Sequence, residues 1–271
     1  MKRLFPSRTI SVPMLVQRVG LLVLSLAVLA GCATAPLAER DPGDRFEAAN
    51  RKVHAFNDGL DTAILRPVSS AWLEGVPEPA RNATSRFFDN LLYLDTILNG
   101  FLQGKLKQGF SDLARFGVNS TVGLLGIFDV ATPMGLPQHK EDFGQTLAVW
   151  GAGSGEYLVY PLIGPSGVRD TGGVVVSLLT NPIVYAAAPV AIPLGLLNIV
   201  DTRARKQGFV QFRDQAALDS YIFTRESYLQ SRVFQIYDGQ PPMQAFEAFE
   251  DVAQPTEPAS PGPDDAARSK A

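Results

Sequence analysis

The stretch from Thr171 to Val200 constrains the fold of this chain more than any other, because its 30 residues include no acidic or basic side chain. It is longer than the ~20 apolar residues that cross a bilayer as a helix. Pro182, Pro189 and Pro193 interrupt it, however, and a proline inside a helix costs about 3 kcal/mol. We therefore predict two or three short helices that lie in or under one membrane leaflet. Two alternatives stay open, namely one kinked transmembrane helix and a pair of core helices in a soluble protein.

The first 31 residues have the pattern of a secretory signal. They hold four basic residues and no acidic one, and their apolar run, Val19 to Ala30, is too short to cross a bilayer. The run ends in Leu29-Ala30-Gly31-Cys32, which resembles the lipobox of bacterial lipoproteins, whose cysteine is acylated and becomes the first mature residue. We predict a lipoprotein signal peptide over 1–31 and a covalent diacylglycerol and N-acyl chain on Cys32, with no cofactor.

Cys32 is the only cysteine of the chain, so no disulfide can form within it. The alternative to lipidation is a small buried cysteine behind an ordinary signal peptide. Met14 is a second candidate start and would give a shorter signal with Arg18 as its one basic residue. Ala33 follows the cysteine, whereas an aspartate there usually retains such lipoproteins in the inner membrane of enteric-type bacteria. The resemblance to these lipoproteins therefore implies the outer membrane.

The remaining chain divides by composition into three parts. We expect a short tether over 32–40, a helical domain over 41–240, and an acidic tail rich in proline and alanine over 241–271. The tail holds too few apolar residues to form a core, so we predict that it is disordered.

Apolar residues recur three and four positions apart along the predicted domain, which indicates amphipathic helices. The first such face comprises Phe46, Ala49, Val53, Phe56 and Leu60. We expect Asp41 to cap that helix and Arg66-Pro67 to end it. A second stretch starts at Pro77–Pro79 and is too apolar for one narrow stripe, and the next helix has a face formed by Leu106, Phe110 and Leu113.

A final amphipathic helix is predicted from Leu218 to Ile236, with Asp238-Gly239 as its stop signal. Arg225, Glu226 and Arg232 lie within it. We expect them to give this helix ion pairs, each worth only a few tenths of a kcal/mol.

The segment 142–170 has two short apolar runs around a glycine cluster. Thr146–Trp150 and Tyr157–Leu162 are rich in β-branched, aromatic and aliphatic residues, and Gly151, Gly153 and Gly155 lie between them. This pattern predicts a β-hairpin whose glycines supply the positive φ angles of a tight connection. Pro161 and Pro165 are expected to stop regular structure after it. An ordinary surface hairpin is the alternative to a functional one.

The charge pattern excludes a nucleic-acid-binding protein. The formal net charge is −3, and the basic residues of the first 31 positions conceal an acidic remainder without clustered lysine or arginine. Nucleic-acid binding needs such clusters.

The sequence also lacks the residues that most enzymes need. His54 and His139 are the only histidines, and neither belongs to a set of about four ligands with the spacing of a zinc site. Ser154 and Ser166 both fail the Gly-x-Ser-x-Gly pattern of a serine hydrolase. The glycine cluster lacks the Lys-Ser/Thr of a phosphate-binding loop. We therefore predict no metal site and no enzymatic activity.

Several motifs together resemble those of the MlaA/VacJ family of outer-membrane lipoproteins. Besides the lipobox they are Asp41-Pro42, Phe46-Glu47, Ala55-Phe56-Asn57-Asp58, Leu65-Arg66-Pro67-Val68, Val76-Pro77-Glu78-Pro79-Ala80-Arg81-Asn82, Leu102-Gln103-Gly104, Arg115-Phe116-Gly117-Val118-Asn119-Ser120-Thr121, Phe128-Asp129-Val130-Ala131, Glu141-Asp142-Phe143-Gly144-Gln145-Thr146-Leu147 and Arg169-Asp170. The match runs from about Asp41 to Gly239 in the order of the family. Glu47-Ala48-Ala49-Asn50-Arg51, in place of a compact Phe-Asn-Arg, and the acidic tail depart from it.

The resemblance implies a mostly α fold, a ring-like bundle of amphipathic and interfacial helices with one β-hairpin, lipid-anchored in the inner leaflet of the outer membrane. An amphipathic channel in the ring would carry phospholipids from the outer leaflet toward the periplasm. The implied partners are porin trimers beside the ring and a soluble periplasmic phospholipid-binding carrier that receives the lipid.

The motif match also implies roles for single residues. Phe56 and Asn57 would shape a gate, Gly151 and Gly153 would form the hinge of the hairpin, and Arg169 and Asp170 would hold the base of the loop or meet lipid headgroups. A structural lipoprotein that stabilises porins or the envelope without moving lipid is the main alternative. A lipid-degrading enzyme is a third, which the missing nucleophile disfavours.

Overall fold

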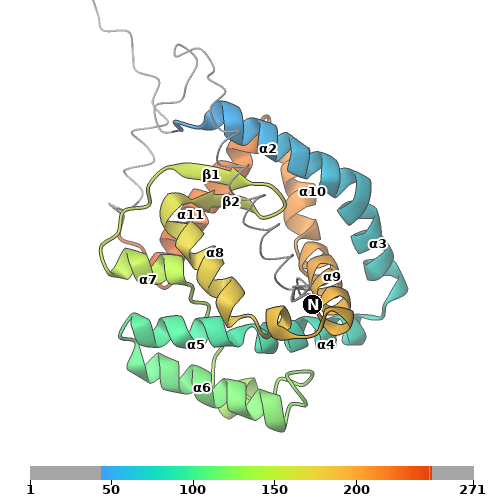
Figure 1. Ribbon diagram of the computed structural model, residues 1–271, viewed down its shortest axis with the longest axis vertical. Helices are drawn as coiled ribbons and strands as arrows, with labels where there is room; N and C mark the ends of the chain where they lie inside the picture. The colour runs from blue at the N-terminus through green and yellow to red at the C-terminus, as the bar shows by residue number, and fades with distance from the viewer. Residues whose placement is uncertain (1–43, 244, 246–271) are drawn as a thin grey trace, which may run out of the picture.

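The computed structural model describes residues 44–243 and residue 245 (Figure 1). The predictions for the signal peptide, Cys32, the tether, the Asp41 cap and nearly all of the acidic tail lie outside these residues. The described chain is mostly helical, with one two-stranded antiparallel sheet. This agrees with the expected fold class.

The elements follow one another around a ring (Figure 1). The first half comprises α2 (Glu47–Leu60), the π-helical turn η3 (Asp61–Leu65), α3 (Arg66–Gly75), α4 (Glu78–Leu91), α5 (Tyr93–Leu102), α6 (Leu106–Thr121) and the 3₁₀ turn η4 (Thr132–Met134). The second half comprises α7 (Phe143–Val149), β1 (Tyr157–Tyr160), β2 (Gly164–Gly167), α8 (Val168–Thr180), the 3₁₀ turn η5 (Pro182–Tyr185), α9 (Ala188–Arg205), α10 (Gln207–Ala216) and α11 (Ser220–Ile236).

The first helix differs from its prediction at both ends. It begins at Glu47, and Asp44 lies buried before it, where it accepts hydrogen bonds from Tyr221 and Asn50. Arg66-Pro67 does not end the helical path, because η3 passes directly into α3. Pro67 is the second residue of α3 and directly follows the π-helical turn, where the Arg66 N–H bonds to the Asp61 carbonyl, so the chain meets the proline with a π-turn and does not end the helix there.

The hairpin lies further along the chain than predicted, because the first of its two expected strands is a helix. Thr146–Trp150 is not a strand, because Asp142 caps α7 by accepting a hydrogen bond from the Gln145 N–H at 2.9 Å. The two strands instead lie on either side of residues 161–163, and Val159 pairs with Pro165. Leu162 and Gly164 supply the positive φ angles of the turn, 68° and 93°. The expectation that Pro165 stops regular structure is therefore wrong, since proline is accommodated at this strand position.

The uncharged stretch Thr171–Val200 is divided as predicted. Its residues lie in α8, η5 and α9, and Asn181 and Ala186–Ala187 separate these pieces. Pro182 and Pro189 lie in the first turns of η5 and α9, and only Pro193 lies inside a helix. Among residues 44–243 and 245, no helix combines the length and hydrophobicity needed to cross a membrane.

Burial in this part of the chain is inverted relative to a water-soluble domain. Nine hydrophobic residues are buried, compared with nineteen polar or charged ones. Thirty-five large hydrophobic side chains are exposed. The densest apolar cluster is small, formed by Tyr157, Val159 and Tyr221 with partly buried neighbours. Exposed apolar area on this scale marks a surface that contacts lipid or protein.

One loop concentrates these exposed side chains. Residues 122–128 follow α6, and Leu124 and Leu125 both have positive φ angles, 52° and 60°, although neither is glycine. Every backbone N–H from Gly123 to Phe128 donates to a backbone carbonyl of residues 118–124. The loop therefore presents Val122, Leu124, Leu125, Ile127 and Phe128 outward on a backbone whose N–H groups are bonded internally.

Candidate functional site

A cleft of about 490 Å³ opens between α5, β2, α8 and α11. Leu92, Pro165, Val174 and Leu178 give it an apolar wall, and most of its remaining lining is polar or charged. Its volume is in the range of sites that bind small organic molecules. An amphiphile fits such a lining better than a wholly polar or wholly apolar ligand.

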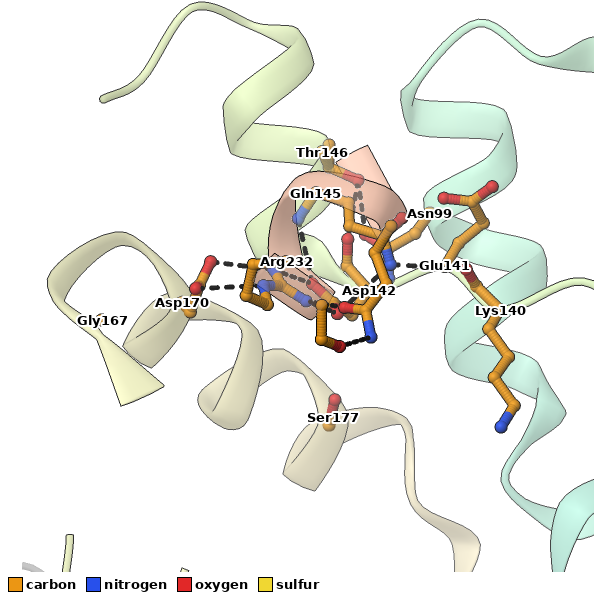
Figure 2. Close-up of polar contacts among 12 residues, drawn as sticks. Asn99, Lys140, Glu141, Asp142, Gln145, Thr146, Gly167, Asp170, Ser177 and Arg232 are labelled. Carbon is orange, nitrogen blue, oxygen red and sulfur yellow. Dashed lines mark hydrogen bonds and ion pairs between the residues drawn. The ribbon is translucent and has the colours of Figure 1, made fainter. Parts of the chain in front are cut away.

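Arg232 on α11 joins the two segments that border this cleft (Figure 2). It donates to both oxygens of Asp142 at 2.6 and 3.0 Å and to both oxygens of Asp170 at 3.1 and 2.8 Å. Tyr228, one turn earlier on α11, donates to Asp170 at 2.6 Å. The N-cap of α7, the first turn of α8 and the middle of α11 are thus held by one guanidinium, which we call the Arg232 junction.

The charges of the junction stabilise one another. Burial by itself would raise the pKa values of Asp142 and Asp170, but the hydrogen bonds and charge of Arg232, together with the Tyr228 hydroxyl on Asp170, lower both. The same carboxylates raise the pKa of Arg232, against the opposing effect of burial. All three groups are therefore charged at neutral pH.

Two glycines allow α7 and α8 to approach each other at the junction. A Cβ atom on Gly144 would collide with Asp170 Oδ1 and would lie 2.6 Å from an Arg232 nitrogen. A Cβ on Gly173 would lie 3.1 Å from the Gly144 backbone nitrogen. A glycine is therefore needed at position 144, because the first turn of α7 packs closely against the Arg232–Asp170 ion pair.

The neighbouring residue Glu141 ties the junction to the α5–α6 connection. Its buried carboxylate accepts hydrogen bonds from Lys105, Gln103 and Gln108 at 2.9, 2.9 and 2.7 Å. Thr146 donates to Asn99 on α5 at 2.8 Å, as Figure 2 shows. Residues 141–146 therefore connect four helices, although α7 itself is only seven residues long.

The expectation for Arg232 is corrected by this geometry. Its ion pairs are not the weak ones expected within the helix, because it is buried and its partners lie 62 and 90 residues away along the chain. Arg225 is also buried and lies 3.8 Å from Asp44 and 3.5 Å from Glu226.

The structure assigns Asn57 a backbone contact. It donates to the Tyr160 carbonyl at 3.0 Å and accepts from the Leu162 N–H at 2.9 Å. Asn50, two helical turns earlier, bonds β1 in the same way. It donates to the Tyr157 carbonyl at 3.0 Å and accepts from the Val159 N–H at 2.9 Å. Seven helical residues and three strand residues both span roughly 10 Å, so α2 and β1 match in spacing. Phe56 lies beside Asn57 in sequence and is 56% exposed.

The other predicted site residues fall in two places. Arg169 and Asp170 begin α8, and Arg169 contacts Asp170 at 3.0 Å beside the Arg232 junction. Gly151 and Gly153 lie between α7 and β1 with open space around them, and Gly151 has φ 93°. They are not in the turn of the hairpin, and their role as a hinge stays a prediction.

One constellation resembles a hydrolase triad but lacks its geometry. His54 Nε2 lies 3.2 Å from the Ser220 hydroxyl and 3.3 Å from Asp58. A triad needs the serine and the aspartate on different ring nitrogens, and here both contact the same one. Within the described residues, no group of three or more His, Cys, Asp or Glu side chains is arranged to hold a metal ion.

Comparison with known proteins places this geometry in context. The family model described as MlaA lipoprotein matches residues 42–235. Curated relatives named "Intermembrane phospholipid transport system lipoprotein MlaA" include that of Escherichia coli, 34% identical over 221 residues and covering 80% of this chain and 88% of the relative. The Haemophilus influenzae relative of the same name is 30% identical over 226 residues, covering 80% and 89%.

A solved structure agrees with the fold. It is described as "Structural basis for maintenance of bacterial outer membrane lipid asymmetry", and it is 33% identical in sequence, with a TM-score of 0.63. The alignment covers 71% of this chain and 98% of that chain.

Proposed function

The chain belongs to the MlaA lipoprotein family, and from this premise we propose that it removes mislocalised phospholipids from the outer leaflet of the outer membrane. It passes them through an amphipathic channel to a periplasmic carrier and so maintains the lipid asymmetry of that membrane. The names of its relatives, which refer to intermembrane phospholipid transport and lipoproteins, support this proposal.

The observation that carries the proposal is the inverted burial of the ring. Large apolar side chains cover its exposed surface while polar and charged side chains are buried between the helices. A protein that lies within one leaflet would satisfy this distribution, because lipid chains cover the apolar surface and buried polar groups pair with one another.

The cleft beside the Arg232 junction suits the transient binding that transport needs. Its apolar wall and polar lining match the two parts of a phospholipid. Weak contacts distributed along a path allow a lipid to enter and to leave.

The anchor and the partners complete the proposal. Cys32 carries the acyl chains, and the ring lies in the periplasmic leaflet of the outer membrane beside porin trimers. The protein uses no cofactor and is not an enzyme. The unsuitable geometry of His54, Ser220 and Asp58 supports this last point for the described residues.

The direct test measures outer-leaflet phospholipid in cells that lack the protein, complemented with the wild type or with Cys32→Ala. We expect phospholipid to accumulate in the outer leaflet and to fall again only with the lipidated form. Normal lipid levels together with destabilised porins would instead favour a structural lipoprotein.

A further inference from the structure

The cleft between α5, β2, α8 and α11 carries an excess of negative charge. Three carboxylates, those of Asp95, Asp142 and Asp170, belong to its lining, together with the single guanidinium of Arg232. Asp142 and Asp170 belong to the Arg232 junction, and Asp95 comes from α5.

Arg232 has no donor left for a ligand. A guanidinium carries five N–H donors, and Arg232 makes five hydrogen bonds, four to Asp142 and Asp170 and one to Gln235 at 2.7 Å. An anionic group that entered the cleft would therefore have to displace an existing carboxylate to reach this charge.

Among the described residues, the hydrogen-bond partners of Asp95 are all neutral. Its oxygens accept from the Asn99 amide at 3.0 Å and from the Ser177 hydroxyl at 2.5 Å. Ser177 lies on α8, the helix that also carries Asp170 (Figure 2). Burial raises the pKa of Asp95, and the nearby charge of Asp142 raises it further, while the Ser177 hydrogen bond opposes both. The carboxyl is thus partly desolvated, and within residues 44–243 no cation is paired with it.

We propose that the cleft at Asp95 binds the primary ammonium of a phospholipid headgroup, and so selects aminophospholipids such as phosphatidylethanolamine. This inference rests on the proposed lipid-transport function. The cavity supplies the space, its apolar wall contacts the acyl chains or the glycerol region, and Asp95 supplies the counter-charge.

The lining of the cleft also favours a primary ammonium group over a quaternary one. A primary ammonium donates three hydrogen bonds, and Asp95, Ser177 and Thr180 offer oxygen acceptors in this lining. A quaternary ammonium donates none and is usually held by a cage of aromatic rings. Tyr228 is the one aromatic side chain of the lining, and its hydroxyl is bonded to Asp170. An anionic phosphatidylglycerol headgroup meets net negative charge instead.

The test uses the full-length lipidated protein in detergent, mixed with equal amounts of phosphatidylethanolamine, phosphatidylglycerol and phosphatidylcholine. After removal of free lipid, mass spectrometry gives the amount of each lipid per protein. We expect phosphatidylethanolamine to be enriched about two- to fivefold over each of the others, the range expected for a partly exposed ion pair. Asp95→Asn lowers this ratio toward one, whereas Glu78→Gln, which removes a charge from α4 outside the cleft, leaves it unchanged.

A second variant guards against a folding defect of Asp95→Asn. Ser177→Lys places a cation beside Asp95, and we expect it to abolish the preference for phosphatidylethanolamine, because the carboxylate then pairs with the new lysine. Equal binding of the three lipids by the wild type would overturn the headgroup inference while leaving lipid transport intact. Binding of no lipid at all would contradict the proposed function itself. A preference that persists in Asp95→Asn, in protein with a normal melting curve, would also refute the role of this residue.

Discussion

Gly144 shows how closely the residues at the Arg232 junction are packed. Its missing side chain leaves space that a charged oxygen of Asp170 and a nitrogen of Arg232 occupy. Gly144→Ala would force these atoms apart, and we expect a loss of about 1–3 kcal/mol in the free energy of unfolding. Urea unfolding in detergent, followed by circular dichroism, measures the change.

Gly153→Ala is the matched control for this substitution. A Cβ added to Gly153 would meet nothing within 4 Å, and the φ angle of this residue is outside the positive range. We expect an unfolding free energy within about 0.5 kcal/mol of the wild type. Equal losses in the two variants would show that the junction does not limit the space at position 144.

Arg232→Met tests the electrostatics of the junction. It leaves Asp142 without this cation and Asp170 with Arg169 beside it, and we expect a loss of about 2–4 kcal/mol at pH 7, below the full value for a buried pair because the Asp142 side chain is 32% exposed. Thermal melting across pH 4 to 8 measures the effect.

The pH dependence of this variant has a defined sign. In the wild type both aspartate pKa values are lowered by folding, so their contribution is present at neutral pH and is lost as the pH falls below about 4. Without Arg232, burial is expected to raise the pKa of Asp142 above that of the unfolded chain, so acidification from pH 7 toward 5 favours the folded variant. A constant difference in melting temperature across this range would contradict the assignment.

At the scale of elements, α2 and β1 are joined through two asparagine side chains that bond to backbone groups. Asn57→Ala removes both bonds to the hairpin turn, and we expect a loss of about 1–2 kcal/mol because the Leu162 N–H and the Tyr160 carbonyl lose their partner. Amide hydrogen exchange should become faster at Leu162 and stay unchanged at Val159.

Asn50→Ala provides the reciprocal measurement. Asn50 bonds the Val159 N–H, so this variant should accelerate exchange at Val159 and leave α2 intact. If either variant accelerates exchange equally at both amides, the two asparagines do not act as separate clamps. The gate at Phe56 and Asn57 stays a prediction, and the Asn57 contact shows that α2 is bonded directly to the hairpin turn.

The sequence predicts the helices well where their apolar residues repeat. The helices at 106–121 and 220–236 and the division of the uncharged stretch follow from periodicity and proline positions. Pro77–Pro79 marks the start of the helix at 78–91, but the stretch expected as one helix is divided at Leu92 into α4 and α5. The strand expected at Thr146–Trp150 is wrong because a short β-branched run also suits a helix, and the cap by Asp142 decides between them. The Asp142-x-x-Gln145 spacing is the signal in the sequence that indicates this cap.

The candidate site is harder to derive from the sequence. Asp170 belongs to a recognised motif, but its partner Arg232 is 62 residues away, and the local pattern around Arg232 predicts only a weak ion pair. Asp95, Asn50 and Ser177 carry no local pattern at all, since their roles depend on which helices meet. An arginine on the apolar side of a helix is the available signal for Arg232, because arginine is rarely buried unless it is paired.

At the scale of the molecule, the residues that the structure describes expose large apolar side chains that should hold the protein to membranes without the acyl chains proposed at Cys32. Each fully buried large apolar side chain contributes about 1.5–3 kcal/mol, so three of those in loop 122–128 match a single myristoyl chain, whose membrane affinity is about 10⁴ M⁻¹. We replace residues 1–32 with an ordinary cleavable secretion signal and expect the protein to stay in the membrane fraction after a high-salt wash.

A variant with fewer apolar side chains in loop 122–128 is the control for this experiment. Leu124→Ser, Leu125→Ser and Phe128→Ser together remove three exposed side chains and should release a substantial part of the unlipidated protein into the soluble fraction. Complete release of the unlipidated wild type would mean that the acyl chains alone hold the protein to the membrane.

The contact between α2 and β1 has a further consequence for crowding. An unpaired strand edge is a template on which a neighbouring molecule can extend the sheet, and this is a common route to aggregation. Along β1 and the turn after it, Asn50 and Asn57 already bond four backbone groups, namely the Tyr157 and Tyr160 carbonyls and the Val159 and Leu162 N–H groups. Two side chains of the same molecule thus occupy the place of a third strand, so copies concentrated in one plane do not polymerise through this edge.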